Sequence, residues 1–211
     1  WILSLAHRAG ERGYWLALRK DLPEDFHDLL SVEVALLERR QLEITVVPGL
    51  LQTPDYTRAL INGANPGMSH EVVERRVLAR MGRQRVLNRP VPLRYHVILD
   101  ETILERQIGS AATMIGQLSR LIDAAAAEHV TIQVLPNSIG ASPALNGSFS
   151  LLTLPEPIPN VGFTESPGGA VYIEDRSEVS RLTERWGILT ERALSVAESE
   201  EAIRAAGKTY G

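Results

Sequence analysis

Residues 93–136 carry the pattern that most constrains the fold of this chain. Two short runs, YHVIL at residues 95–99 and VTIQVL at residues 130–135, are rich in β-branched and aromatic residues, which favour strands. Between them, residues 110–128 place apolar side chains on one helical face. These side chains are Met114, Leu118, Leu121, Ile122 and Ala125. Two strands joined by a helix of this length pair in parallel with a right-handed crossover, so the sequence predicts a βαβ unit.

Three further strands are predicted downstream of this unit. Asn-Gly introduces an apolar run at residues 148–154. Residues 161–165 and 170–174 flank a Ser-Pro-Gly-Gly sequence, and glycine supplies the positive φ that hairpin turns need. We therefore expect a mixed sheet of about five strands with a βαβ unit and a C-terminal hairpin, which is an α+β fold.

Helices are predicted at both ends of the chain, where they would pack on the sheet. The N-terminal part, residues 1–40, is predicted to be helical, with its second helix over residues 23–40. Near the C-terminus, Asp175 begins one helical pattern as a cap. Ser195 and Glu198 have the spacing of a capping box at the start of another.

Several classes of chemistry are excluded by what the sequence lacks. It contains no cysteine, which excludes disulfides, thiolate nucleophiles and thiolate metal ligands. Its five histidines never stand three or four residues apart, so a helical zinc pair is absent. The glycine motifs of phosphate and dinucleotide sites and of serine hydrolases are also absent. We therefore expect no metal and no cofactor.

The charge and hydropathy of the chain limit its partners. A net charge of -4 argues against a chain that coats nucleic acid by itself. No apolar stretch approaches the roughly 20 residues that a membrane-spanning helix needs. We expect a cytoplasmic protein that contacts no membrane.

The stretch TVVPGLLQTPDYTRAL, residues 45–60, combines turn and helix-start signals with side chains that are available for contact. Its Pro-Gly pair is a turn signal, and Thr53-Pro54 fits the cap and the first position of a helix. Most of the stretch therefore serves as a turn and a helix start. Gln52 and Tyr56 remain as candidates for contact with a ligand or a partner.

Residues 69–87 form a predicted helix that is rich in arginine. Arg76, Arg80 and Arg83 fall on one side of it, and other arginines scatter around it. Guanidinium groups bind phosphates and carboxylates through paired hydrogen bonds, so a docking face for an acidic partner is one interpretation. The acidic balance of the chain favours the other, which is a solvated face or pairing with the acidic C-terminal helices.

Acidic residues follow two of the predicted strands. Asp100 and Glu101 lie just past the first strand of the βαβ unit, and Glu165 ends a hairpin strand. Clefts open beyond the carboxyl ends of such strands, so two carboxylates in one cleft would allow acid–base chemistry. Strand-end acids also commonly serve solubility and helix capping, and no catalytic motif is present. We predict no enzyme activity and keep a small hydrolase-like enzyme as the alternative.

Six segments occur in a characteristic order along the chain: VVPGLLQTPDYTRALI, VERRVLARMGRQRVLNRP, VILDE, HVTIQVLP, ALNGSFSLLTLP and GGAVYIED. In order and spacing they resemble the C-terminal domain of actinobacterial WhiJ-like regulators, which are antitoxin-like helix-turn-helix transcription factors. The resemblance covers roughly residues 25–205. It implies a regulatory or interaction domain that follows an N-terminal DNA-binding module.

This resemblance also implies a division of the chain. Residues 1–22 would be the remnant of a helix that connects to the DNA-binding module, and residues 23–211 would be the regulatory domain. DNA would be contacted only through that N-terminal module. The partner would be a small acidic protein or a small-molecule effector.

The leading hypothesis is a non-catalytic sensor domain that relays ligand or partner binding to the DNA-binding module. The candidate contacts are Gln52, Tyr56, Arg89, Arg94 and Glu101. In the alternative interpretation, Tyr56 packs in the core and Arg89 caps the C-terminal end of a helix. The long connection at residues 137–147 is a candidate lid.

A dimerisation module is the remaining alternative. Two apolar stripes offer a homodimer interface: Phe26, Val34 and Leu37, and Val179, Trp186 and Leu189. Burial of Trp186 inside the domain would argue against an interface on the second stripe.

Overall fold

Six strands form one mixed sheet in the computed structural model, which describes residues 32–166 and 169–211. The strands are β1 (Glu38–Glu43), β2 (Arg94–Asp100), β3 (Val130–Leu135), β4 (Phe149–Thr153), β5 (Val161–Ser166) and β6 (Gly169–Ile173). Their order across the sheet is β3-β2-β1-β4-β5-β6. β1 pairs in parallel with β2, and β2 with β3, whereas the pairs from β1 to β6 through β4 and β5 are antiparallel. The predicted α+β fold, with its βαβ unit and C-terminal hairpin, is confirmed.

β1 is the strand that the sequence did not predict. The helix expected over residues 23–40 is present at residues 32–35, but the chain is already a strand at Glu38. The sequence ERRQLE contains one apolar residue, Leu42, so it lacks the β-branched and aromatic signal of a buried strand. Some partners of its polar side chains, such as Ser150 for Arg39 and Tyr95 for Gln41, lie far along the chain, where no local pattern reveals them. The expected residues 1–22 of the connecting helix lie outside the described residues.

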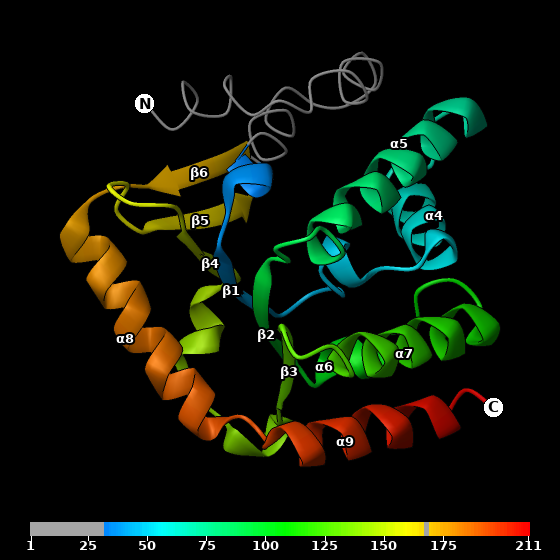
Figure 1. The fold of residues 1–211 in the computed structure, drawn as a ribbon. Coiled ribbons are helices and arrows are strands. Elements are labelled where there is room, and N and C mark those ends of the chain that lie inside the picture. Colours follow the sequence, from blue (N-terminus) through cyan, green and yellow to red (C-terminus); the bar gives the residue numbers. More distant parts are fainter. Residues whose placement is uncertain (1–31, 167–168) are drawn as a thin grey trace.

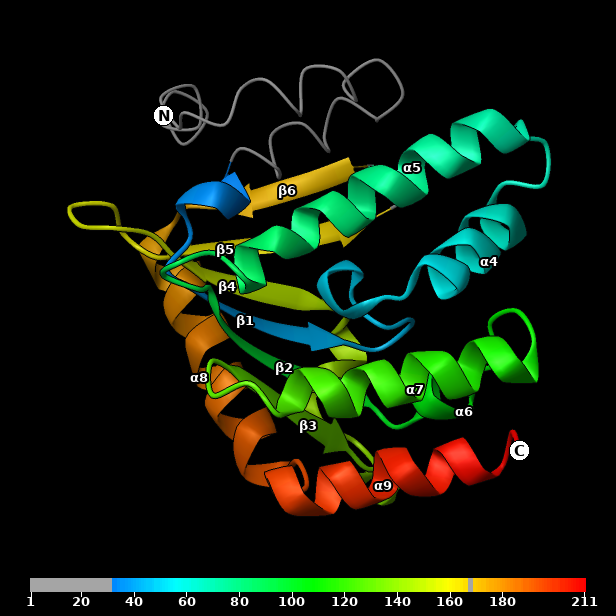
Figure 2. The same cartoon turned by 45° about the vertical axis from the view of Figure 1, so that its right-hand side comes forward.

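Helices cover both faces of the sheet and one of its edges (Figures 1 and 2). The α-helices whose whole length is described are α4 (Pro54–Ala64), α5 (His70–Arg83), α6 (Thr102–Glu105), α7 (Ala111–Ala125), α8 (Arg176–Arg192) and α9 (Val196–Lys208). α8 crosses one face, while α4, α5 and α7 lie on the other. α9 runs along β3, where Ser199 Oγ accepts a hydrogen bond from Val134 N at 2.9 Å. This contact occupies a backbone group on a strand edge that would otherwise be open.

The predicted helix starts are present. Thr53 Oγ1 accepts a hydrogen bond from Tyr56 N at the start of α4, with proline in the first turn. Asp175 accepts hydrogen bonds from two backbone amides of α8, and Ser195 and Glu198 form the capping box of α9. These caps satisfy amides that have no partner inside their helix.

Two apolar cores lie on opposite faces of the sheet. The larger core joins the sheet to α7 and to the turn before α4, and includes Tyr95, Leu118 and Phe163. The other joins the sheet to α8 and includes Leu151 and Trp186. Since Trp186 is 5% exposed, its stripe packs inside the domain and does not offer a dimer surface.

Candidate functional site

A cavity of about 160 Å³ opens at the carboxyl end of β1, on the face that carries α4 and α5. Its polar lining consists of Arg39, Gln41, Glu43, Gln52, Arg80, Arg83 and Glu165. Residues 46–50 of the turn after β1, together with Leu60 of α4, complete the lining. β1 lies between β2 on one side and β4 on the other, so the chain adds strands first on one side of β1 and later on the opposite side. Ligand sites in open sheets form at such reversals of strand order, beyond the carboxyl ends of strands.

β1 supplies a polar stripe to this cavity. Arg39, Gln41 and Glu43 alternate along the strand, so their side chains project from the same face of the sheet. β1 is a central strand, and Arg39 and Gln41 are 2% and 5% exposed. Polar side chains in such a place lose water and require partners inside the protein. The whole stripe is held by such partners.

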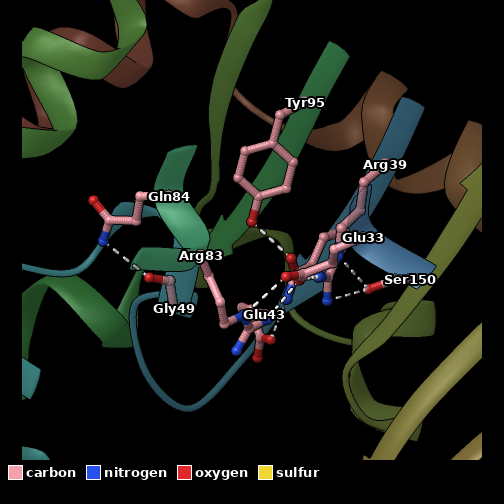
Figure 3. Close-up of polar contacts among 9 residues, drawn as sticks. Glu33, Arg39, Glu43, Gly49, Arg83, Gln84, Tyr95 and Ser150 are labelled. Atoms are coloured by element: carbon pink, nitrogen blue, oxygen red, sulfur yellow. Dashed lines mark hydrogen bonds and ion pairs between the residues drawn. The ribbon is translucent and has the colours of Figure 1, made fainter. Parts of the chain in front are cut away.

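Glu33 lies buried behind the cavity and holds two of its arginines. Arg83 donates to both carboxylate oxygens, from Nε at 2.8 Å and from Nη2 at 2.5 Å, and Arg39 Nη1 donates at 2.8 Å. Figure 3 shows the two guanidinium groups converging on Glu33 from different elements. Burial by itself would raise the pKa of Glu33, but the charges and hydrogen bonds of Arg83, and then of Arg39, outweigh it and lower the pKa. The ionised carboxylate therefore orients both arginines.

Arg39 is fixed by two further contacts. Its Nε and Nη2 donate to Ser150 Oγ on β4 at 3.3 and 3.2 Å. Its guanidinium carbon lies 5.8 Å from the ring centroid of Phe163 on β5, within the range of a cation–π contact. Strands β1, β4 and β5 thus hold this side chain in one position.

A second chain of hydrogen bonds leads to Glu43. Tyr95 Oη donates to Gln41 Oε1 at 2.6 Å, and Gln41 Nε2 donates to Glu43 Oε1 at 2.6 Å. Burial raises the pKa of Glu43, and the hydrogen bonds from Gln41 and Ser148 only partly oppose this shift. Glu43 is therefore a carboxyl group whose proton affinity differs from that of a solvated glutamate, as is common in functional sites.

The turn after β1 is held by three glutamine side chains. Gln52 Nε2 donates to Val47 O at 2.6 Å, and Gln84 Nε2 donates to the carbonyls of Gly49 and Gln52 at 3.1 and 2.7 Å. Gln117 on α7 accepts from Thr53 N and donates to Leu51 O. Figure 3 shows the contact between Gln84 and Gly49. The backbone of the cavity rim is therefore fixed by side chains from α5's end and α7.

Arg80 differs from the other two arginines of the lining. Its Nη1 donates to Gln52 Oε1 at 2.9 Å, and within the described part of the chain it makes no ion pair. Its Cδ and Nε lie over Gly49, where an added Cβ would stand 3.5 Å from each atom. Burial, and then the charge of Arg83, lower the pKa of Arg80 to about 10. At neutral pH the group is still a cation, and none of the described carboxylates forms an ion pair with it.

The family model described as "Domain of unknown function (DUF5753)" matches residues 26–205 of the chain. The chain belongs to this family. A search of curated proteins and a search of solved structures each found no match.

In this family member, one of the five candidate contacts lies at the cavity. Gln52 lines it and is 2% exposed. Tyr56 is buried in the larger core, and its hydroxyl accepts from Val47 N at 3.2 Å, so it supports the rim from behind. Both residues therefore hold the turn after β1 at Val47, since Gln52 donates to its carbonyl and Tyr56 accepts from its amide.

The other three candidates lie elsewhere. Arg89 donates to the carbonyls of Val34 and Leu36, at the end of the helical residues 32–35, as the capping alternative predicts. Arg94 is exposed and stands 4.0 Å from Glu38 at the start of β1. Glu101 accepts a hydrogen bond from Asn137 N at 2.7 Å, beyond the end of β2. None of the three lines the cavity.

The interpretation of the arginine helix as a solvated face is corrected for two of its residues. Arg80 and Arg83 turn inward to the cavity, and Arg83 pairs with Glu33 rather than with the C-terminal helices. Their shared helical side was visible in the sequence. Their partner Glu33 stands 50 positions away, so the sequence pattern could not identify it.

Two features of the predicted enzyme alternative are also placed. Asp100 accepts hydrogen bonds from Thr102 N and Oγ1, which is a local turn contact. Glu165 lines the cavity, where the second carboxylate is Glu43 rather than Asp100 or Glu101.

The connection at residues 137–147, the candidate lid, forms two short 3₁₀ helices away from the cavity lining, and Arg192 donates to two of its carbonyls.

Across residues 32–166 and 169–211, no group of three or more histidine, aspartate or glutamate side chains is arranged to hold a metal ion. In the same part of the chain, no helix combines the length and apolar character needed to cross a membrane.

Proposed function

We propose that this chain is the ligand-sensing domain of a helix-turn-helix transcriptional regulator, active in the cytoplasm and without catalysis of its own. The observation that carries the proposal is the polar stripe of Arg39, Gln41 and Glu43 on a central strand beside a cavity. A buried ion-pair network is weak support for stability, because apolar residues of similar size often serve a core better. A cluster of fixed polar side chains beside a cavity, at a reversal of strand order, is the arrangement typical of ligand sites in open sheets.

Glu33 provides a route by which an occupied cavity would act on the rest of the regulator. It belongs to residues 32–35, which follow the N-terminal part of the chain, and its carboxylate is bound by two arginines of the cavity. A ligand that draws Arg39 or Arg83 toward itself would weaken their hold on Glu33. In this proposal the position of residues 32–36 reports occupancy to the N-terminal DNA-binding module, and DNA is contacted only there.

Relay of this kind requires that the ligand bind two conformations with different affinity. The two conformations would differ in whether Glu33 remains bound by both arginines. A ligand that leaves these contacts unchanged would shift nothing, however tightly it binds. The proposal therefore concerns the contacts of Glu33 as much as the cavity itself.

The test is native mass spectrometry of the purified chain, combined with backbone hydrogen exchange at residues 34–37. We expect a small molecule to co-purify and to leave on acid unfolding. Its removal should change the exchange rate of Leu36 and Leu37, whose amides bond to Glu33 O and Thr153 O. A chain that retains no small molecule from a cytosolic extract would contradict the proposal, as would a ligand that leaves exchange at these amides unchanged.

A hydrolase-like enzyme is the second candidate, because Glu43 and Glu165 line the same cavity and burial raises the pKa of Glu43. Two carboxyl groups in one cavity can serve acid–base catalysis when their environments differ. Release of a modified co-purified compound, lost in Glu43→Gln and in Glu165→Gln, would favour this candidate. A small acidic partner protein, rather than a small molecule, would appear in the same mass spectrum as a heterodimer.

A further inference from the structure

Arg80 is a partly buried cation that makes no ion pair with any residue in the described part of the chain, although the charges of Glu165 and Glu33 act on it from a distance. Gln52 Oε1 accepts from its Nη1, but a neutral amide does not neutralise its charge. Arg39 and Arg83, by contrast, share the carboxylate of Glu33. A guanidinium group binds a carboxylate through charge-assisted hydrogen bonds, which offset part of the cost of removing both charges from water. An anionic group of a ligand would complete this site.

Two carboxylates in the same cavity limit what that ligand can be. Glu43 stands at the end of β1 and Glu165 near the end of β5, and these strands run in the same direction on either side of β4. The side chain of Glu165 makes no hydrogen bond or ion pair to any other described residue, and Gln41 donates to Glu43. A ligand that is only anionic would be repelled by both acids. A ligand that also carries a cation would be attracted to them.

The size of the cavity sets the scale of the ligand. Its volume of about 160 Å³ lies below the roughly 300–1,000 Å³ of pockets that hold drug-sized molecules. Apolar surface is added to the polar lining by Val46, Val47, Pro48, Leu50 and Leu60. The cavity therefore suits a metabolite with two opposite charges close together and a small apolar part.

We propose that the cavity binds a small zwitterion of the α-amino acid class, with its carboxylate on Arg80 and its ammonium group between Glu43 and Glu165. This inference rests on the proposed sensing function, and it names the ligand class of the same site. The carboxylate adds an acceptor beside the pair of Arg80 and Gln52, and the ammonium group donates to the two glutamates. Both charges of the ligand are then matched, and the cavity lining gains the anion that Arg80 lacks.

The test is isothermal titration of the full chain with the common L-amino acids, one at a time. We expect at least one to bind. For that amino acid, two analogues separate the two contacts: the acid without its amino group, and the amide without its carboxylate charge. Each analogue should bind about tenfold to a hundredfold more weakly, which is the usual effect of losing one charged hydrogen-bonded contact.

Two variants connect the analogues to named residues. Arg80→Gln should weaken binding of the amino acid by a similar factor. It should not weaken binding of the amide analogue further, because that analogue has already lost the contact with Arg80. Glu165→Gln should weaken binding of the amino acid and should not weaken binding of the deaminated acid, which loses one repelling carboxylate in this variant. Arg94→Gln is the matched control, since it removes an exposed arginine away from the cavity and should leave every affinity unchanged.

Three results would overturn the proposal: no amino acid binds, the deaminated acid binds as tightly as its parent, or Arg80→Gln binds like the unmodified chain. Failure of the ligand class is distinguishable from failure of the sensing function. A co-purified molecule of other chemistry that is lost from Arg80→Gln in native mass spectra would uphold sensing and reject the zwitterion. A chain that binds neither amino acids nor any co-purified molecule would reject both.

Discussion

The two faces of the sheet solve the same problem of burial with different chemistry. On the face toward α8, Leu42, Ile98 and Leu151 of three adjacent strands pack with Trp186. On the opposite face, β1, the strand that carries Leu42, presents Arg39, Gln41 and Glu43. Both faces are covered by helices (Figure 2). One strand thus contributes to an ordinary apolar core and to a charged cluster.

This difference teaches that burial alone does not explain the charged face. An apolar contact needs only shape and area, whereas each charge on β1 needs partners in fixed positions. For Arg39 and Gln41 the partners come from the segment before β1, from β2 and from β4, and Arg83 of α5 shares Glu33 with Arg39. The α8 face can tolerate similar apolar side chains, but the cavity face depends on particular pairs. The following variants test this contrast.

The largest loss of stability is expected from breaking the charged cluster on one side only. Glu33→Gln leaves Arg39 and Arg83 buried without their carboxylate, so the free energy of unfolding should fall by about 3–5 kcal/mol. Urea unfolding measures this change. The matched control is Glu200→Gln, which breaks an exposed pair with Arg204 and should cost no more than about 0.5 kcal/mol. Equal effects of the two variants would contradict the account.

The apolar face should lose stability by cavity formation. Leu189 is 0% exposed, so Leu189→Ala should lower the free energy of unfolding by about 3 kcal/mol. Its neighbour Ile188 is 45% exposed, and Ile188→Ala should change it by less than about 0.5 kcal/mol. Thermal or urea unfolding gives both values. Neither variant should alter the affinity of a ligand in the cavity, and a change that exceeds the loss of folded protein would show that the faces are coupled.

A smaller loss of folding stability is expected from Tyr95→Phe. This variant removes the hydroxyl that donates to Gln41 Oε1 at 2.6 Å and leaves a buried acceptor without its partner. The cost should be about 1–3 kcal/mol. Tyr210→Phe is a control, since that hydroxyl donates to backbone carbonyls of Leu104 and Glu105 nearer the surface and should cost less. A cost for Tyr95→Phe no larger than for the control would remove Gln41 from the network.

The smallest expected effect is a gain in stability, and it depends on pH. Burial raises the pKa of Glu43 above its ordinary value of 4.5, so the folded state binds a proton more tightly than the unfolded state. This stabilisation is complete below the ordinary value and is lost as pH rises through the folded-state pKa. Glu43→Gln avoids the loss, so it should be more stable than the unmodified chain at neutral pH, by about 1 kcal/mol.

The same variant should show no advantage in acid, below the ordinary pKa of glutamate, where Glu43 is protonated in both states. Unfolding by urea at neutral and acidic pH measures the two differences. A gain of equal size at both pH values would mean that the carboxylate charge is not the cause. A loss at neutral pH would mean that ionised Glu43 supports the fold.

The sequence predicted the strands and helices whose signals are local. β2 and β3 are apolar and β-branched, and the helices after Thr53 and Ser195 begin with caps that can be read over four residues. β1 was missed because ERRQLE has no such signal. Its buried residues Arg39 and Gln41 are satisfied by Glu33, Ser150 and Tyr95, and these partners lie far apart in the sequence.

Only part of the candidate site could be predicted from the sequence, again because only local signals can be recognised there. Gln52 was identified from the turn, where proline and glycine expose a polar side chain to a groove. Arg80 and Arg83 had the spacing of one helical side, but the sequence did not show whether that side faced solvent or the sheet. Arg39, Gln41 and Glu43 alternate with the period of a strand, which is a usable signal once the segment is recognised as β.

The most direct test of the central claim is the free energy of unfolding of one triple variant, Glu33→Leu with Arg39→Met and Arg83→Met. This variant replaces the whole buried ion cluster with apolar side chains of similar length and leaves no unpaired charge. If the cluster is kept for recognition, the variant should be at least as stable as the unmodified chain in urea. A loss as large as that of Glu33→Gln alone would contradict this, and would mean that the charges on β1 hold the fold together.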